Sequence, residues 1–313
     1  MGPDGPKPEH VKQGIFGDCF LLAGVMGLAR RRPEAITSGV FQTNPQEPQT
    51  THKVRFFRVP RRADADQSIT PETVSVSNSV LSMTRDLKMD DGGVAETGTA
   101  YGAHGEEPWP AIIEKAFAAW PGRPSGEDLA GGHGNAGLAM LTGDAYVDKT
   151  LALETGAEAH DAIRGKVPTG LSQIETMEAE KKLLAEARAR LVAARRPAHK
   201  QKLIELASSG EPTSVSTKGA PSDEWRARCA PTRMPWSSDA SAAEVGSSGE
   251  AMMGGIAHKH VYELVDATDT SVKLRNPWGK YARVRGSVKK DQAVSELTWT
   301  EFFEVATSYT LKT

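Results

Sequence analysis

The sequence QGIFGDCFLLAGVMGLA, residues 13–29, decides the fold because it joins a turn to a buried helix at a cysteine. Gly14 and Gly17 are typical of a turn. Residues 19–29 are apolar on nearly every helical face, which predicts a helix that is buried all round. Three arginines follow, where cations suit the helix dipole, and Pro33 ends the helix. Cys19 is therefore expected at the N-terminus of a buried helix.

A thiol in this position has the features of a nucleophile. The positive end of the helix dipole and the unpaired N–H groups of the first turn both favour thiolate over thiol. Gln13 lies just upstream, and its side-chain amide can donate to a developing oxyanion, with the backbone N–H of Cys19 as a second donor. The alternative is that Cys19 packs as a small apolar residue.

The other half of such a site is predicted at a hairpin late in the chain. Residues 260–265 and 271–275 have strand patterns, and residues 266–270 form the turn between them. Antiparallel pairing would bring His260 and Asn276 to the same end of the sheet, where the asparagine can orient a histidine base. Trp278 would cover this pair. His258 is a rival base, two residues away on the same strand face, and a histidine in a purely packing role is the alternative.

The remaining pattern predicts an α+β fold with helices early and strands late. We expect strands at 54–59, 73–76, 213–217 and 308–311, and helices at 109–117, 171–206 (divided by Pro197) and 298–304. Loops are expected at 89–108 and 131–134, with a long surface excursion at 218–250.

Composition narrows the class of protein. The chain has 313 residues and a formal net charge of −2, which gives no field for nucleic acid, and no apolar run is long enough to span a membrane. With two cysteines and no secretory leader pattern, we expect a reduced, intracellular protein, although a secreted effector stays open. Cys229 is interpreted as a free loop thiol.

Four sequence blocks in order give a family resemblance. Residues 13–23, 109–117, 260–262 and 274–279 resemble the cysteine, helix, histidine and asparagine segments of calpains. The resemblance implies a papain-type fold with a cleft between two lobes. The helical lobe would span 1–145. The antiparallel β lobe would span 146–313, with a helical insertion at about 171–207. It also implies catalytic roles for Cys19, His260 and Asn276, an oxyanion role for Gln13, and Trp278 beside Asn276.

The resemblance also raises the question of calcium, which calpain cores typically bind through acidic side chains. Glu107 fits one such ligand position. His10 stands at a second, and the basic run Lys280 to Arg283 follows the asparagine motif where a carboxylate is usual. Since calcium prefers several oxygen ligands, we expect that no cofactor is required and that calcium is unnecessary or weakly bound.

The function predicted is endopeptidase cleavage of protein substrates through a Cys–His–Asn triad. Two other classes remain open. The same triad serves deamidases, transglutaminases and acyltransferases, and a protease fold can persist as a binding module. The complete set of Cys19, His260, Asn276 and Gln13 argues against the second. The sequence does not indicate an oligomeric state.

Overall fold

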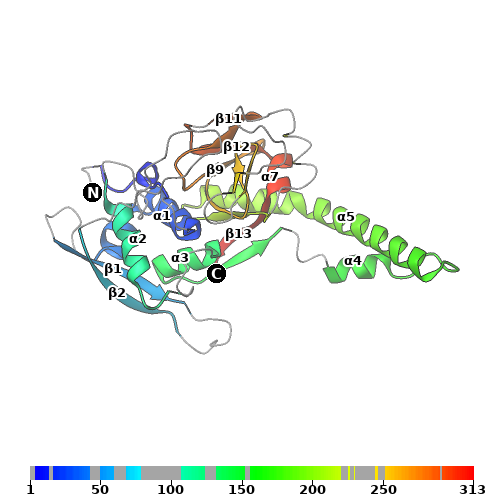
Figure 1. Cartoon of the computed structure of the whole chain (residues 1–313), viewed down its shortest axis with the longest axis horizontal. Coiled ribbons are helices and arrows are strands. Elements are labelled where there is room, and N and C mark those ends of the chain that lie inside the picture. The colour runs from blue at the N-terminus through cyan, green and yellow to red at the C-terminus, as the bar shows by residue number, and fades with distance from the viewer. Residues whose placement is uncertain are drawn as a thin grey trace.

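The computed structural model of the chain describes residues 4–13, 17–42, 50–59, 68–78, 107–123, 132–151, 156–219, 225, 229, 244–245, 251–289 and 291–313. These residues form a mixed structure of helices and sheets (Figure 1). The turn residues 14–16 and most of the predicted loop at 89–108, namely residues 89–106, lie outside the described residues.

The first half of the chain contains the elements η1 (Pro8–His10), α1 (Cys19–Arg31), η2 (Ala35–Val40), β1 (Thr51–Arg58), β2 (Thr70–Ser77), α2 (Trp109–Ala119) and α3 (Gly134–Thr142). The middle contains β3 (Tyr146–Thr150), α4 (Gly156–Ile163), α5 (Gln173–Ser208), β4 (Ser214–Thr217), β5 (Glu244–Val245), β6 (Ala251–Met253) and β7 (Ile256–Ala257). The end contains β8 (Val261–Ala267), β9 (Ser271–Arg275), β10 (Ala282–Val284), β11 (Ser287–Lys289), β12 (Val294–Thr298), α7 (Trp299–Val305) and β13 (Ala306–Lys312).

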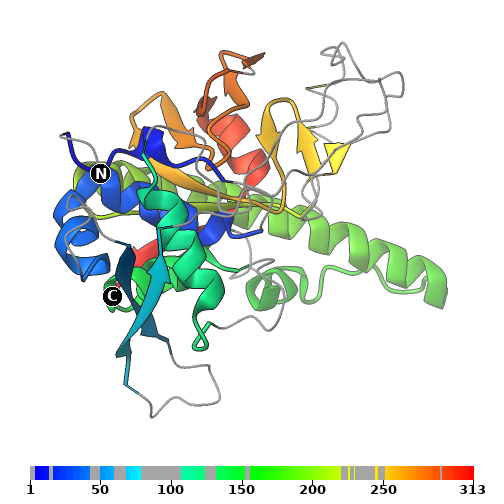
Figure 2. The same ribbon diagram turned by 60° about the vertical axis from the view of Figure 1, so that its left-hand side comes forward.

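An eight-stranded sheet organises the second half, in the order β11-β10-β12-β9-β8-β4-β13-β3. Its neighbouring strands pair antiparallel except for β10 and β12, which run parallel, so the expectation of a purely antiparallel sheet is wrong at this edge. In the first half, β1 and β2 form a separate antiparallel hairpin that lies beside α2 (Figure 2). The predicted hairpin of β8 and β9 is confirmed.

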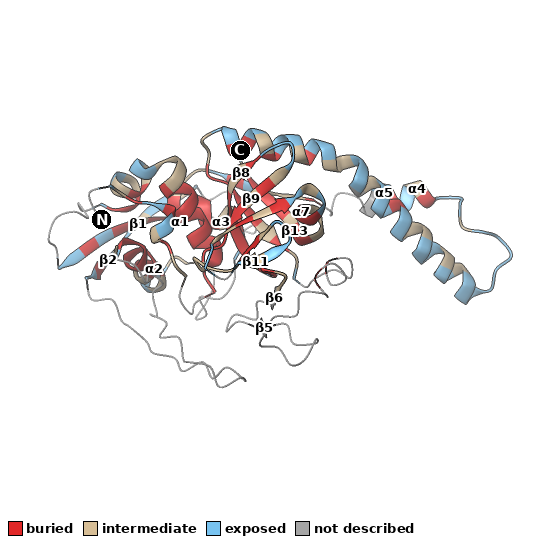
Figure 3. Cartoon of the chain, turned by 90° about the horizontal axis from the view of Figure 1, so that it is seen from above, coloured by how far each residue is buried: buried red, intermediate tan, exposed pale blue. Residues whose placement is uncertain are grey.

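Two large hydrophobic cores lie among the described residues. The first core joins α1, η2, β1 and α2, and it includes Val261 from β8. The second core joins the large sheet, α7 and the C-terminal end of α5. Figure 3 shows α1, β8 and β9 buried together at the centre of the molecule.

The predicted helix at Cys19 is confirmed, and its boundaries follow from backbone hydrogen bonds. The carbonyl of Asp18 accepts hydrogen bonds from the N–H groups of Leu21 (2.9 Å) and Leu22 (3.1 Å), which starts α1. The helix buries every residue from Cys19 to Ala29. Cys19 is therefore fixed as the first helical residue by the hydrogen bonds to Asp18 and by the packing of the residues after it.

The prediction that Pro197 divides the long helix is wrong. α5 runs unbroken from Gln173 to Ser208 with Pro197 inside it. A proline removes one helical hydrogen bond, but the residues around it are anchored by tertiary contacts. His199 Nδ1 lies 3.1 Å from the Tyr309 hydroxyl, and the Arg196 guanidinium stands 5.2 Å from the Phe303 ring centroid.

Three further differences from the sequence interpretation concern short or apolar segments. Gly134 was assigned to a loop but begins α3, and β3 and α4 were not predicted. Most of the 218–250 excursion lies outside the described residues. The two positions described within its middle, Trp225 and Cys229, are buried in the second core, so at these points the interpretation as a surface excursion is wrong.

Candidate active site

The structure brings His260 and Asn276 together at one end of the β8–β9 hairpin. His260 lies just before β8 and Asn276 just after β9, and His260 Nε2 lies 3.0 Å from Asn276 Oδ1. Both side chains are buried. The sixteen-residue spacing thus closes into a hydrogen bond because the hairpin returns the chain to its starting end.

The hydrogen bonds around Asn276 fix the tautomer of His260. The backbone N–H of Trp278 lies 3.0 Å from Asn276 Oδ1 and can only donate, so this atom must be the amide oxygen. An amide oxygen can only accept, and Nε2 of His260 must therefore carry the hydrogen. In the neutral ring, Nδ1 then has the lone pair and is the nitrogen able to take a proton.

The backbone and the ring of His260 are also held in place. The N–H of His260 donates to Thr217 Oγ1 (3.0 Å), and the Thr217 hydroxyl is 3.1 Å from the carbonyl oxygen of His260. The rings of Trp278 and Tyr262 lie 4.9 Å and 5.1 Å from the His260 ring between centroids. Sequence reasoning named Trp278 but missed Thr217, which carries no signal beyond a short strand pattern.

Cys19 lies in the first half of the chain. It begins α1, which packs against β8, and it shares the first core with Val261, the residue after His260. Cys19 is 4% exposed and forms no disulfide. Cys19 thus begins the helix that packs against β8, the strand that follows His260.

A buried carboxyl pair lies next to the cysteine. Asp18 is 1% exposed and Glu114, on α2, is 2% exposed. Burial raises the pKa of Glu114 well above its ordinary value of 4.5, and the charge of the nearby Asp18 raises it further. Burial and the neighbouring Asp18 therefore both favour the protonated form of Glu114.

Gln13 ends the segment of residues 7–13, which we call the N-terminal strap. Its backbone N–H donates to the carbonyl of Pro277 (2.8 Å), next to Asn276. The Lys12 side chain packs on Gly279, where an added Cβ would come within 2.9 Å of Lys12 Cγ and where φ is +71°. The strap thus places Gln13 against the asparagine turn.

The rival histidine and the predicted metal ligand occupy other places. His258 is buried in the connection between β7 and β8, not on a strand, so the expectation that it shares a strand face with His260 is wrong. The hydrogen bond to Asn276 belongs to His260. Glu107 lies two residues before α2, and among the described residues no group of three or more His, Cys, Asp or Glu side chains is arranged to hold a metal ion.

The segment after the asparagine turn contains a buried, positively charged residue. Arg283 is buried, and its guanidinium donates to Glu301 Oε1 (2.9 Å) and to the carbonyl of Gly254 (3.2 Å). It also lies 3.9 Å from Cys229 Sγ and 4.8 Å from the ring centroid of Trp225. Arg283 and Cys229 are therefore part of the second core's packing.

Comparison with known proteins identifies the family of this chain. Residues 1–293 match the family described as calpain family cysteine protease. The chain belongs to the calpain family of cysteine proteases. A search among curated protein sequences finds no match. Within the described residues, no helix of this calpain-family chain is both long and apolar enough to cross a membrane.

Proposed function

We propose that this calpain-family protein is an endopeptidase that cleaves protein substrates with Cys19 as nucleophile, His260 as base and Asn276 as the orienting residue. The observation that carries the proposal is the hydrogen bond from His260 Nε2 to Asn276 Oδ1. His260 directly precedes β8, and the Cys19 helix packs against that strand. The hydrogen bond leaves Nδ1 of His260 as the proton-transferring atom.

The first half of the reaction forms a thioester. His260 Nδ1 takes the proton of the Cys19 thiol, and the thiolate adds to the carbonyl carbon of the scissile peptide bond. The Gln13 side-chain amide and the backbone N–H of Cys19 donate to the oxyanion. The C–N bond then breaks, and His260 gives its proton to the leaving amine, so that the acyl group stays on sulfur.

The second half releases the acyl group. His260 Nδ1 accepts a proton from water as the oxygen adds to the thioester carbonyl. The C–S bond then breaks and frees the new carboxyl end, and His260 returns the proton to sulfur to regenerate the thiol. Throughout, the Asn276 oxygen accepts from Nε2 and stabilises the ring in both charge states. Trp278 shields this hydrogen bond from water.

The proposed architecture is the two-lobed, papain-type arrangement, with a substrate cleft between the lobes. The two hydrophobic cores support it, because one gathers residues mainly before 145 and the other residues after it. In this reading β3, which begins at Tyr146 and pairs with β13, is the first strand of the second lobe.

The test is cleavage of an unfolded protein, with new termini mapped by mass spectrometry. Cys19→Ala should reduce turnover by at least about 10³-fold and abolish labelling by an epoxide inhibitor. Cys229→Ala is the matched control and should keep turnover, since Cys229 packs in the second core. Melting curves confirm that each variant folds.

Two outcomes would overturn the proposal. Full turnover in Cys19→Ala would remove the cysteine mechanism. Deamidated glutamine side chains or acyl-transfer products without new termini would keep the triad but assign it to another acyl reaction.

A further inference from the structure

The β8–β9 hairpin carries the histidine and the asparagine, but both of its strands also hold a buried charge. Glu263 lies three residues after His260, and Arg275 lies directly before Asn276. The two are cross-strand partners in the hairpin. Glu263 is fully buried and Arg275 is 8% exposed, so each needs a partner of opposite charge.

Each of these charges is paired with a residue from the first part of the chain. Arg30, in the last turn of the Cys19 helix, donates from Nε to Glu263 Oε1 at 2.5 Å. On the other strand, Arg275 Nη1 lies 2.9 Å from Glu9 Oε1 in the N-terminal strap. Arg275 also acts electrostatically on Glu263.

The four residues therefore form a ladder of alternating charge. It begins on α1, crosses β8 and β9, and ends on the strap. We call Arg30, Glu263, Arg275 and Glu9 the charge ladder. Its inner members, Glu263 and Arg275, belong to the hairpin. Of its outer members, Glu9 lies before Gln13 and Arg30 lies after Cys19. The hairpin is thus held from two sides by the part of the chain that carries the nucleophile.

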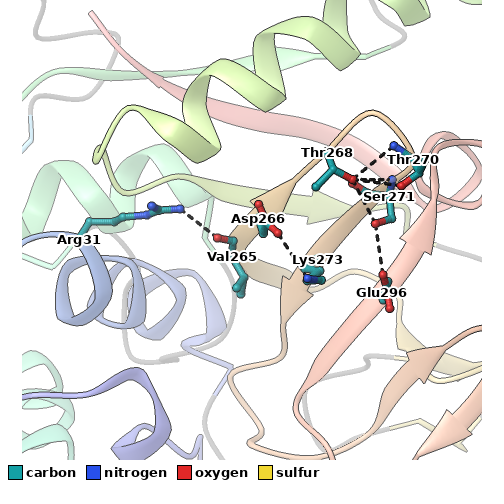
Figure 4. Close-up of polar contacts among 8 residues, drawn as sticks. All are labelled: Arg31, Val265, Asp266, Thr268, Thr270, Ser271, Lys273 and Glu296. Atoms are coloured by element: carbon teal, nitrogen blue, oxygen red, sulfur yellow. Dashed lines mark hydrogen bonds and ion pairs between the residues drawn. The ribbon is translucent and has the colours of Figure 1, made fainter.

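A second contact from α1 uses an irregularity in β8. The pairing of β8 with β9 shifts between Leu264 and Asp266, which leaves Val265 as the extra residue of a bulge. Arg31 Nη2 donates to the carbonyl oxygen of Val265 at 2.9 Å (Figure 4). The bulge therefore presents a backbone oxygen to the helix.

The far end of the hairpin is stiffened by its own polar contacts (Figure 4). The Thr268 hydroxyl accepts hydrogen bonds from the N–H groups of Thr270 (3.3 Å) and Ser271 (3.2 Å). Across the strands, Lys273 Nζ lies 3.4 Å from Asp266 Oδ2. These contacts hold the turn end of the hairpin together, opposite the end where His260 and Asn276 lie.

We propose that the charge ladder, together with the Arg31–Val265 contact, is a built-in clamp that positions His260 and Asn276 against Cys19. The inference rests on the proposed function, and it assigns Glu9, Arg30 and Arg31 as positioning residues. These residues touch neither the substrate nor the reacting atoms. They act by fixing the hairpin relative to the helix, because a misplacement of about 1 Å can cost about 10²-fold in rate.

Glu9 and Arg31 are the best positions for a test. Glu9→Gln leaves Arg275 with Glu263 as its cross-strand neighbour, and Arg31→Met leaves only the backbone carbonyl of Val265 without this donor. The variants are Glu9→Gln and Arg31→Met. Matched controls are Glu158→Gln and Arg195→Met, which break an ion pair of similar length (2.6 Å) between α4 and α5. All four are compared by melting, by kcat/KM on an unfolded protein, and by the pH profile of Cys19 alkylation.

The alkylation rate of Cys19 depends on its pairing with His260, and it can be measured without peptidase activity. Trypsin releases residues 13–30 as one peptide, so iodoacetamide labelling of Cys19 is quantified separately from Cys229. A cysteine paired with a histidine reacts at acidic pH, whereas an ordinary thiol has a pKa of about 8.5. Glu9→Gln and Arg31→Met should each slow labelling at about pH 6 by about tenfold and lower kcat/KM similarly, while the controls match the parent protein.

The outcomes separate the two proposals. Unchanged acid-side labelling and kcat/KM in both strap and helix variants would overturn the clamp. Equal losses in the controls would also overturn it, because the effect would then be general destabilisation. A parent protein that shows acid-side labelling but cleaves no protein would refute the endopeptidase proposal, while the labelling of the variants would still test the clamp.

Discussion

Helix α1 and the helix pair α4–α5 differ in how they pack against the rest of the molecule. α1 is buried from Cys19 to Ala29 and contacts elements of both cores. The N-terminal half of α5 projects from the body with α4 beside it, and its surface is largely exposed (Figures 1 and 3). Their contact is a small separate cluster that includes Ala159, Ile163 and Ala187. We call this projection, residues 156–191, the arm.

The comparison shows that a helix is coupled to the site through its contacts with the two cores, and that being helical is not enough. Every face of α1 meets another element, so a change there alters the cores and the site together. The arm touches the rest of the chain mainly through the C-terminal end of α5, at Leu203 and Leu206. Changes in the arm should therefore stay local.

The largest effect is expected where α1 and α3 touch at Gly137. A Cβ there would overlap the carbonyl oxygen of Phe20 and come within 3.2 Å of the N–H nitrogen of Leu21. Backbone atoms cannot move aside, so Gly137→Ala should lower stability by at least about 2 kcal/mol. Helix propensity alone predicts the opposite, a gain of about 1 kcal/mol. Chemical denaturation of the parent and of Gly137→Ala gives the sign of the change in the free energy of unfolding.

Gly219→Ala is the matched control. An added Cβ at Gly219 meets nothing within 4 Å, and its stability should change by less than about 0.5 kcal/mol. A stabilised Gly137→Ala protein would show that the contact between α1 and α3 can adapt. The packing of α1 would then be less different from that of the arm.

A smaller and strictly local effect is expected in the arm. Ile163 is 5% exposed and packs in the arm's cluster. Ile163→Ala should destabilise α4 by about 2 kcal/mol and speed amide hydrogen exchange across residues 156–163. The value of kcat/KM should stay within about twofold of the parent. A loss of activity equal to that of a site variant would mean that the arm is coupled to the site.

The sequence predicted the centre of the molecule better than its periphery. Cys19, His260 and Asn276 stand at element boundaries with strong signals, namely a glycine-flanked helix start, a two-stranded pattern and a proline after the strand. Their partners come from distant segments without such signals. Thr217, Glu9 and Arg31 look like ordinary strand or surface residues, and only the tertiary structure brings them to the hairpin.

The errors also have physical causes. Pro197 is a helix breaker by local rules, but packing of its neighbours on Phe303 and Tyr309 keeps α5 continuous. Gly134 has a loop-like composition around it, but it must be small because an added Cβ would come within 2.8 Å of the Ser214 side chain. Local propensity was overruled at both positions by contacts distant in sequence.

A modest, pH-dependent effect is expected from the carboxyl pair beside α1. Because the pKa of Glu114 is raised in the folded protein, the folded state keeps a proton that the unfolded chain releases above about pH 4.5. Stability from this group is thus present at low pH and is lost as pH rises toward the folded pKa. Glu114→Gln cannot titrate, so its advantage over the parent should grow with pH.

The measurement is the melting temperature of parent and Glu114→Gln between about pH 5 and about pH 8, where 1 kcal/mol corresponds to about 2–4 °C. A non-titrating control is the surface change Glu158→Gln in the arm. Parallel curves for parent and Glu114→Gln would mean that Glu114 ionises normally in the folded state.

The smallest effect is expected from calcium. Contacts within the chain already join α1 to the β8–β9 hairpin, through Arg30, Arg31 and the strap. The segment after Asn276 carries Lys280 and the buried Arg283, and a divalent cation near these charges would gain little to offset its lost hydration. Proteolysis with excess chelator and with about 1 mM calcium should therefore agree within about twofold, and melting should be equally insensitive. A large, saturable activation would contradict this. It would require calcium ligands other than acidic side chains, such as backbone carbonyls.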